Sequence, residues 1–201
     1  MSTPPEPAAP PPPHAIGPTV AEFRELAIPR LIERYRTGSS LIQRRVLDLT
    51  DEQLDTFFLP DVSIGRWSCR VLLGHIADAD LVNAHRMRRI VAEDFPVLSL
   101  WDENAFIDAG LYGGPRGGAD KPVAGFVAII HAIRMWSAEW LTTLDGEQLA
   151  RAALHPERGP TSVLDVLVYG AWHLEHHIAY LNLKLDRLLG PAPVVADQPR
   201  P

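Results

Sequence analysis

Apolar residues recur at helical spacing in four segments of this 201-residue chain. The segments cover about residues 19–49, 68–93, 120–144 and 161–190. Side chains three or four residues apart share one face of an α-helix, so each segment can form an amphipathic helix. No segment shows the strict alternation that is typical of a strand. Four helices of this length, with one long connection, predict an all-α fold: a four-helix bundle with a long crossover connection.

Local signals mark where these helices begin. Ser68 is expected to be the N-cap of the second helix, and Asp120 precedes an early proline at the start of the third. The fourth helix is expected to open at Thr161 or Ser162, with Asp165 placed as the acid of a capping box. The connection over residues 95–119 contains a glycine-rich turn, and a connection of this length often carries function.

Proline-rich tails bound the predicted folded unit. Residues 1–18 form a Pro/Ala tract, which we expect to be disordered because it offers little to pack and few backbone donors. Residues 191–201 have a similar composition and are expected to be flexible. The single domain is therefore predicted to span residues 19–190.

Composition excludes several classes of function. The net charge of −6 provides no basic patch for nucleic acid. No apolar run is long enough to cross a bilayer, and the N-terminus lacks a secretory pattern. Cys69, the single cysteine, cannot form an internal disulfide and fits a reducing compartment. These features predict a cytoplasmic protein without a membrane or nucleic-acid partner. We also expect a small molecule as the substrate.

Two histidines in the fourth segment have the spacing of a metal-ligand pair. His173 and His177 are four residues apart, so both imidazoles lie on one face of a helix. They lie about 105° and about 65° from the centre of the apolar face, on the same side. His75, about 70° from the apolar face of the second helix, is the expected third ligand. A lone helical histidine is more often structural than a ligand, so the pair carries the prediction.

The remaining histidines are weaker candidates for metal ligands. His176 lies almost opposite the apolar face, so we expect it in solvent as a bystander. His85 points away from the core, and His131 is expected to be structural or interfacial. His14 and His155 receive no role. All these positions follow from the sequence and helical geometry.

Two familiar catalytic patterns are absent. There is no His-Glu-x-x-His helix, and Glu175 projects away from the histidine pair, which makes it a poor general base. No Gly-x-Ser-x-Gly elbow is present. Cys69 is expected on the apolar side of its helix, which argues against a cysteine nucleophile.

Several short motifs together resemble the DinB/YfiT-like superfamily. They are Trp67-Ser68, then His75-Ile76-Ala77-Asp78-Ala79, then the closing His173-x-x-x-His177-Ile178-Ala179. The phrase His155-Pro156-Glu157-Arg158-Gly159-Pro160 is similar to many members as well. The resemblance extends over about residues 30–188. It implies a four-helix bundle in which His75, His173 and His177 bind one divalent metal ion, commonly nickel or zinc. It also implies a homodimer.

The resemblance leaves the activity open. Many members are described only as metal-dependent hydrolases. Others resemble S-transferases or isomerases that use a low-molecular-weight thiol. Three neutral imidazoles leave a coordination position open, where zinc lowers the pKa of water to near 7 or stabilises a thiolate. Two further readings are a non-enzymatic metal-binding stress-response protein and a helical interaction module without metal.

Other side chains could lie near the three histidines and support them. Asp78, Asp102 and Glu103 could orient the imidazoles, although we favour caps and solvated charges for all three. Tyr169 and Tyr180 lie on the histidine side of the fourth helix, where they could line a pocket or serve equally well as packing residues. Three tryptophans are expected to pack in the bundle or at a dimer surface: Trp136, Trp140 and Trp172.

Overall fold

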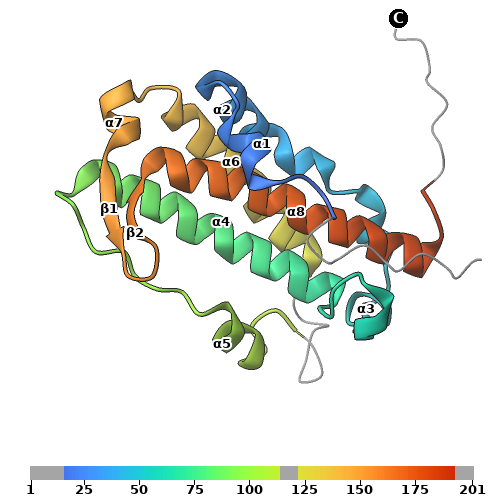
Figure 1. Cartoon of the computed structure of the whole chain (residues 1–201). Helices are drawn as coiled ribbons and strands as arrows, with labels where there is room; N and C mark the ends of the chain where they lie inside the picture. Colours follow the sequence, from blue (N-terminus) through green and yellow to red (C-terminus); the bar gives the residue numbers. More distant parts are fainter. Residues whose placement is uncertain (1–15, 114–121, 193–201) are drawn as a thin grey trace, which may run out of the picture.

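The computed structural model describes residues 16–113 and 122–192 and is dominated by helices (Figure 1). The elements in chain order are α1 (Val20–Arg24), α2 (Ile28–Thr37), the 3-10 turns η2 (Gly38–Leu41) and η3 (Arg44–Asp48), α3 (Asp51–Leu54), η4 (Pro60–Val62), α4 (Cys69–Ala92), α5 (Glu103–Asp108), α6 (Val123–Leu141), α7 (Gly146–Ala150), β1 (Ala152–His155), β2 (Gly159–Ser162) and α8 (Val163–Leu189).

Helices α2, α4, α6 and α8 form a bundle. Helix α4 packs against α6 and α8, and α2 packs against the same two helices, so the four close around a shared core. Figure 1 shows α4 and α8 lying side by side along the length of the molecule, with the hairpin at one end and α3 at the other. The predicted four-helix bundle is confirmed. Within the described part of the chain, no helix is both long and apolar enough to span a membrane.

The predicted helix starts are confirmed where they are described. The Ser68 hydroxyl accepts a hydrogen bond from Val71 N at 3.2 Å, which caps α4. Ser162 caps α8, and Asp165 completes the capping box with a carboxylate that accepts from Ser162 N at 3.1 Å. The expected cap at Asp120 lies outside the described residues, and α6 begins after Pro122.

The expectation of a fold without strands is wrong in one place. Strands β1 and β2 form an antiparallel hairpin in which Ala152 pairs with Ser162 and His155 with Gly159. Four-residue strands are too short to show a period of two, and Gly159 at φ +77° supplies the turn. The hairpin leads directly into α8.

The long connection between α4 and α6 contains structure of its own. Val97 bridges to Leu154 of the hairpin, and α5 follows, capped by Asp102, whose carboxylate accepts from Asn104 N at 3.0 Å. Beyond α5, Tyr112 lies against α4 at Gly74, where an added Cβ would come within 2.4 Å of the tyrosine ring. Its hydroxyl donates to Asp78 at 2.6 Å. These contacts hold the connection along one side of α4.

A buried ion pair ties the four bundle helices together. Arg134 of α6 donates to both carboxylate oxygens of Asp80 of α4, at 2.6 and 2.7 Å, with both side chains no more than 1% exposed. The same guanidinium donates to the backbone oxygens of Tyr35 in α2 and Gly170 in α8, at 3.1 and 2.7 Å. Every bundle helix therefore contributes a partner to one arginine.

The described ends of the chain lie against α8. Trp172 Nε1 donates to Pro18 O at 3.0 Å, and Gly17 packs closely on Ala179. The predicted tails, 1–18 and 191–201, fall largely outside the described residues, so their disorder and the domain limits 19–190 stay predictions.

Candidate metal centre

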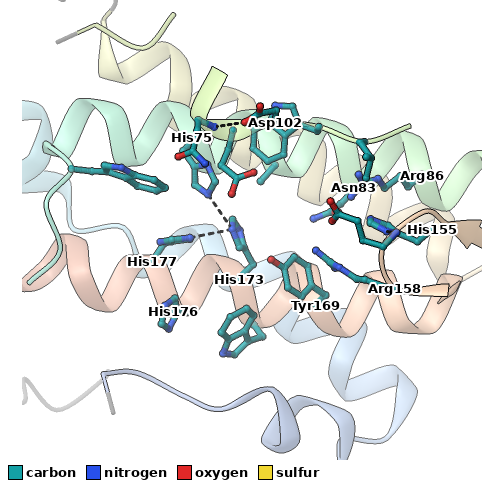
Figure 2. A pocket seen from close by; sticks show the side chains of 18 residues that line it. His75, Asn83, Arg86, Asp102, His155, Arg158, Tyr169, His173, His176 and His177 are labelled. Atoms are coloured by element: carbon teal, nitrogen blue, oxygen red, sulfur yellow. Dashed lines mark hydrogen bonds between the residues drawn. The ribbon is translucent and has the colours of Figure 1, made fainter. Parts of the chain in front are cut away.

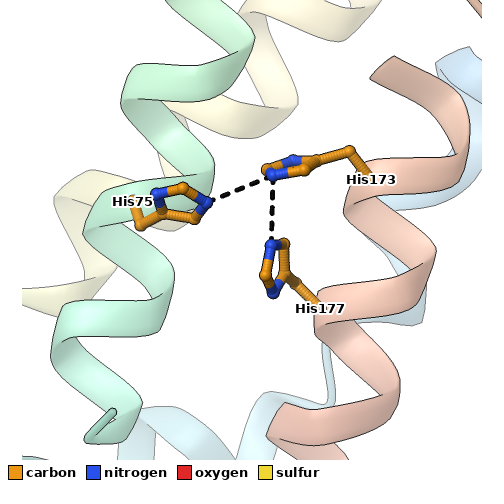
Figure 3. Close-up of side chains that lie close together, drawn as sticks. All are labelled: His75, His173 and His177. Carbon is orange, nitrogen blue, oxygen red and sulfur yellow. Dashed lines mark hydrogen bonds between the residues drawn. The ribbon is translucent and has the colours of Figure 1, made fainter. Parts of the chain in front are cut away.

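Three histidines from two helices meet beside the core (Figure 3). His75 comes from α4, and His173 and His177 come from successive turns of α8. The Nε2 atoms of His75 and His173 are 3.1 Å apart, and those of His177 and His173 are also 3.1 Å apart. One ligand atom from each of the three side chains lies within 4.8 Å of the others. The packing of α4 on α8 thus brings together the three residues that the sequence singled out.

Burial keeps these imidazoles neutral. His75 is 4% exposed and His173 is 6% exposed, while His177 is half-buried. Burial lowers the pKa of His75 to about 4, and the nearby charge of Glu103 opposes that shift. Burial also lowers the pKa of His173 and His177 well below the ordinary value, and their histidine neighbours add to the effect. Each ring therefore presents a free lone pair at neutral pH.

Aromatic rings surround the three histidines. The ring of Trp67, which precedes α4, lies 4.8 Å from that of His75, and the ring of Trp101 stacks on His75 at 5.3 Å. Tyr169, one turn before His173 on α8, stacks on that histidine at 5.5 Å. Tyr169 also lines a cavity on the histidine side, which is one of the two roles that the sequence left open for it. The rings restrict how far the imidazoles can rotate.

None of the three acidic side chains near the site hydrogen-bonds to an imidazole within the described residues, and the preferred interpretation as a cap holds for Asp102. Asp78 accepts from Tyr112, and Asp102 caps α5. Nδ1 of His75 is buried and has no hydrogen-bond partner among the described residues. Glu103 acts on His75 through its charge, without a hydrogen bond to that ring.

Most of the other expectations near the site hold. Glu175 is turned away and forms an ion pair with Arg34 at 2.7 Å, and Cys69 is fully buried, with its pKa raised to about 11 by burial. His85 is exposed.

The expectation for His176 is wrong: it is half-buried, and it stacks on Trp172 at a ring separation of 4.9 Å. Residues 16–18 and Trp172 cover a side of α8 that the helical wheel alone assigns to solvent.

A cavity of about 610 Å³ opens from the histidines along the groove between α4 and α8 (Figure 2). His75, His173 and His177 line one end, and Tyr169 lies in the middle. The far end is lined by four polar side chains that the sequence analysis did not select: Asn83, Arg86, His155 and Arg158.

The sequence held a partial signal for these residues. Asn83 and Arg86 follow His75 by eight and eleven residues on α4, which places all three on one stripe of the helix. His155 and Arg158 come from the hairpin, which the sequence analysis took for a loop. Their place in the cavity depends on tertiary packing that no local pattern shows.

A second hollow of about 440 Å³ adjoins the other side of His177. Tyr180, predicted to line a pocket, lies here together with Lys184. The Lys184 ammonium donates to the backbone oxygens of Ile64 and Gly65, and burial lowers its pKa to about 8. Lys184 thus fixes the segment that leads into Trp67 and α4.

The chain is similar in sequence to proteins of a known family. Residues 34–181 match the sequence model of the DinB superfamily. A protein of Oceanobacillus iheyensis named "putative metal-dependent hydrolase" is 26% identical over 161 residues, which cover 80% of this chain and 87% of that protein. A Bacillus licheniformis protein of the same name is 28% identical over 174 residues, covering 85% and 91% of the two chains.

The solved structure of YfiT from Bacillus subtilis has a similar fold. It superposes with a TM-score of 0.67 at 24% identity and covers 82% of this chain and 89% of that one. Its description, "a probable metal-dependent hydrolase with an unusual four-helix bundle topology", agrees with the arrangement of α2, α4, α6 and α8.

Proposed function

Because the chain belongs to the DinB superfamily, we propose that it is a metal-dependent hydrolase whose divalent metal ion is held by His75, His173 and His177. The substrate is a small molecule that enters the cavity between α4 and α8. We further propose nickel or zinc as the metal, one ion per chain, and a cytoplasmic homodimer as the working form.

The observation that carries the proposal is the convergence of three ring nitrogens. Nε2 of His173 faces Nε2 of both His75 and His177 at 3.1 Å. A neutral ring nitrogen has either one proton or one lone pair, so His173 Nε2 cannot form good hydrogen bonds with both neighbours at once. A divalent cation would accept all three lone pairs together, and neutral imidazole is a ligand that nickel and zinc both favour.

The surroundings of the three histidines fit an open site. Among the described residues the donor set is three imidazoles, and one side of the cluster borders the cavity of about 610 Å³. When bound in such a site, a divalent metal acts as a Lewis acid and lowers the pKa of a water molecule toward neutrality.

The chain's own side chains would prepare the reaction. Trp67 and Trp101 pack against the ring of His75, and Trp67 also stacks on His177, so both limit the access of bulk water. Glu103 lines the cavity and acts electrostatically on His75, so its carboxylate is our candidate for accepting a proton beside the site. In hydrolysis the oxygen of water forms the new bond to the substrate, and the departing group leaves with a proton.

Metal content tests the proposal directly. We would measure it by elemental mass spectrometry on the full-length chain, for wild type, His75→Ala and His177→Ala. His85→Ala is the matched control, because His85 is an exposed histidine on the same helix. We expect about one ion per chain in wild type and the control, and loss of the ion in both site variants. Absence of metal from every sample, even after dialysis against zinc and nickel, would contradict the proposal.

Activity assays on the metal-loaded protein then distinguish hydrolysis from thiol-dependent chemistry. A hydrolase releases product with water alone. A thiol-dependent transferase or isomerase, which would use the same histidines, requires a low-molecular-weight thiol in the mixture.

A further inference from the structure

The end of the cavity away from the histidines is a cluster of hydrogen-bond donors. Arg86 is half-buried on α4, and its Nε is buried without a partner among the described residues. One terminal nitrogen of Arg86 donates to Ser99 O at 3.0 Å. Arg158, at the hairpin turn, lies over the ring of Tyr169 at 4.6 Å. Both guanidiniums line the same cavity.

Neither guanidinium has a carboxylate partner in the described chain. Glu157 lines the cavity as well, but it is exposed and forms no ion pair with Arg86 or Arg158. Asp165, the next carboxylate nearby, is paired with Arg24 at 3.0 Å. Burial lowers the pKa of Arg86, and the charge of Arg158 lowers it further. Two like charges thus share a hollow without an ion pair in the described chain, and the charge of Glu157 offsets only part of the effect on Arg86. The net charge of the whole chain is −6.

Two buried neutral side chains add donors at the same place. His155 is 3% exposed, and its Nδ1 accepts a hydrogen bond from Glu157 N at 3.2 Å. The ring proton of neutral His155 is therefore on Nε2, which can donate. Asn83 is 4% exposed, lines the cavity and has no hydrogen bond within the described residues. The Asn83 amide nitrogen can therefore donate to a group bound in the cavity.

We propose that Asn83, Arg86, His155 and Arg158 bind an anionic group of the substrate, a carboxylate or a phosphate, while the bond to be cleaved lies at the three histidines. This inference rests on the proposed function and specifies its substrate class. Arginine suits both anions, because its guanidinium can donate two parallel hydrogen bonds to a carboxylate or phosphate.

The spacing of the two ends sets the shape of the substrate. Eleven residues separate His75 from Arg86, a rise of about 16 Å along α4. The arginine side chain leans back toward the helix N-terminus, which shortens the gap. Tyr169 lies between His173 and Arg158, and its ring contacts both. The substrate is therefore elongated, with an anionic group at one end and the reactive bond several bonds away.

The test uses binding, without turnover. We would titrate the full-length chain with phenyl phosphate, benzoate and neutral benzyl alcohol at pH 8, using calorimetry or ligand-observed NMR. Samples would be used as purified and after chelation. We expect both anions to bind at least about tenfold more tightly than the alcohol, because charge-assisted hydrogen bonds contribute at least this factor. The tighter of the two anions identifies the substrate group as phosphate or carboxylate.

Variants locate the binding site. Arg86→Gln and Arg158→Gln should each weaken anion binding about tenfold. Arg30→Gln is the control, since Arg30 is exposed on α2 and lies outside this cavity. It should leave binding unchanged. Equal binding of the alcohol, or equal weakening in Arg30→Gln and Arg86→Gln, would overturn the inference.

The two proposals fail separately. If the anions bind only while metal is present, and the arginine variants bind like wild type, the metal holds the anion and the donor cluster has no such role. If elemental analysis finds no metal but the chain still binds the anions through Arg86 and Arg158, the donor cluster stands and the proposed function falls.

Discussion

At the scale of single residues, the free-energy cost of protonating the buried histidines determines how the stability of the chain depends on pH. A histidine whose pKa is lower in the folded than in the unfolded chain contributes its full stability above the unfolded value, near 6.5. That contribution is lost as the pH falls toward the folded value, because the unfolded chain then binds more protons. For His75 the folded pKa is about 4, so the loss begins below about pH 6.5.

We therefore predict that the chelated chain loses stability between pH 7 and pH 5, by on the order of 2 kcal/mol from His75 alone. Urea unfolding at a series of pH values measures the effect. His75→Leu should flatten the dependence, whereas His85→Leu should not. Equal stability of the wild-type chain at pH 7 and pH 5 would contradict the lowered pKa values.

At the scale of helices, Arg134 connects all four members of the bundle. Removing one partner of a buried ion pair leaves the other charge without compensation, so Arg134→Met should cost about 3–5 kcal/mol. Arg36→Met is the comparison, because Arg36 forms an exposed pair with Glu33 and its loss should cost less than about 1 kcal/mol. Denaturant unfolding measures both.

A double variant separates the charge from the packing. Asp80→Leu combined with Arg134→Met removes both charges, and should recover much of the stability lost in either single variant. A double variant as unstable as the sum of the singles would show that the hydrogen bonds to Tyr35 and Gly170 dominate instead.

The sequence predicted the last three bundle helices far better than the connections. The helix expected over residues 19–49 is divided instead into α1, α2, η2 and η3. Ser68, Ser162 and Asp165 act locally, through caps that depend on the next three residues, so their roles can be read from the sequence. His75, His173 and His177 could be selected because each helix fixes the direction of its side chains. His155 and Arg158 could not be selected, because a four-residue strand has no distinctive period and its position depends on distant packing.

At the scale of the whole molecule, the bundle should persist without metal. Leu72 and Ile76 of α4 belong to the same apolar cluster as Leu174 and Ile178 of α8, so these helices pack together independently of the histidines. We predict that chelation leaves the far-ultraviolet circular dichroism spectrum unchanged and lowers the melting temperature by roughly 10 °C, the loss of ligand stabilisation expected for a tightly held ion. Loss of helical signal on chelation would favour a structural, non-enzymatic metal.

The lining of the cavity comes from two kinds of structure. The three histidines lie on packed helices, whereas Trp101 and Glu103 belong to the long connection and His155 and Arg158 to the hairpin. Connections tolerate substitution and insertion better than packed helices do. After gene duplication, a descendant of this chain could therefore acquire a new substrate through changes in two short segments, while the three histidines that we propose as metal ligands are inherited intact.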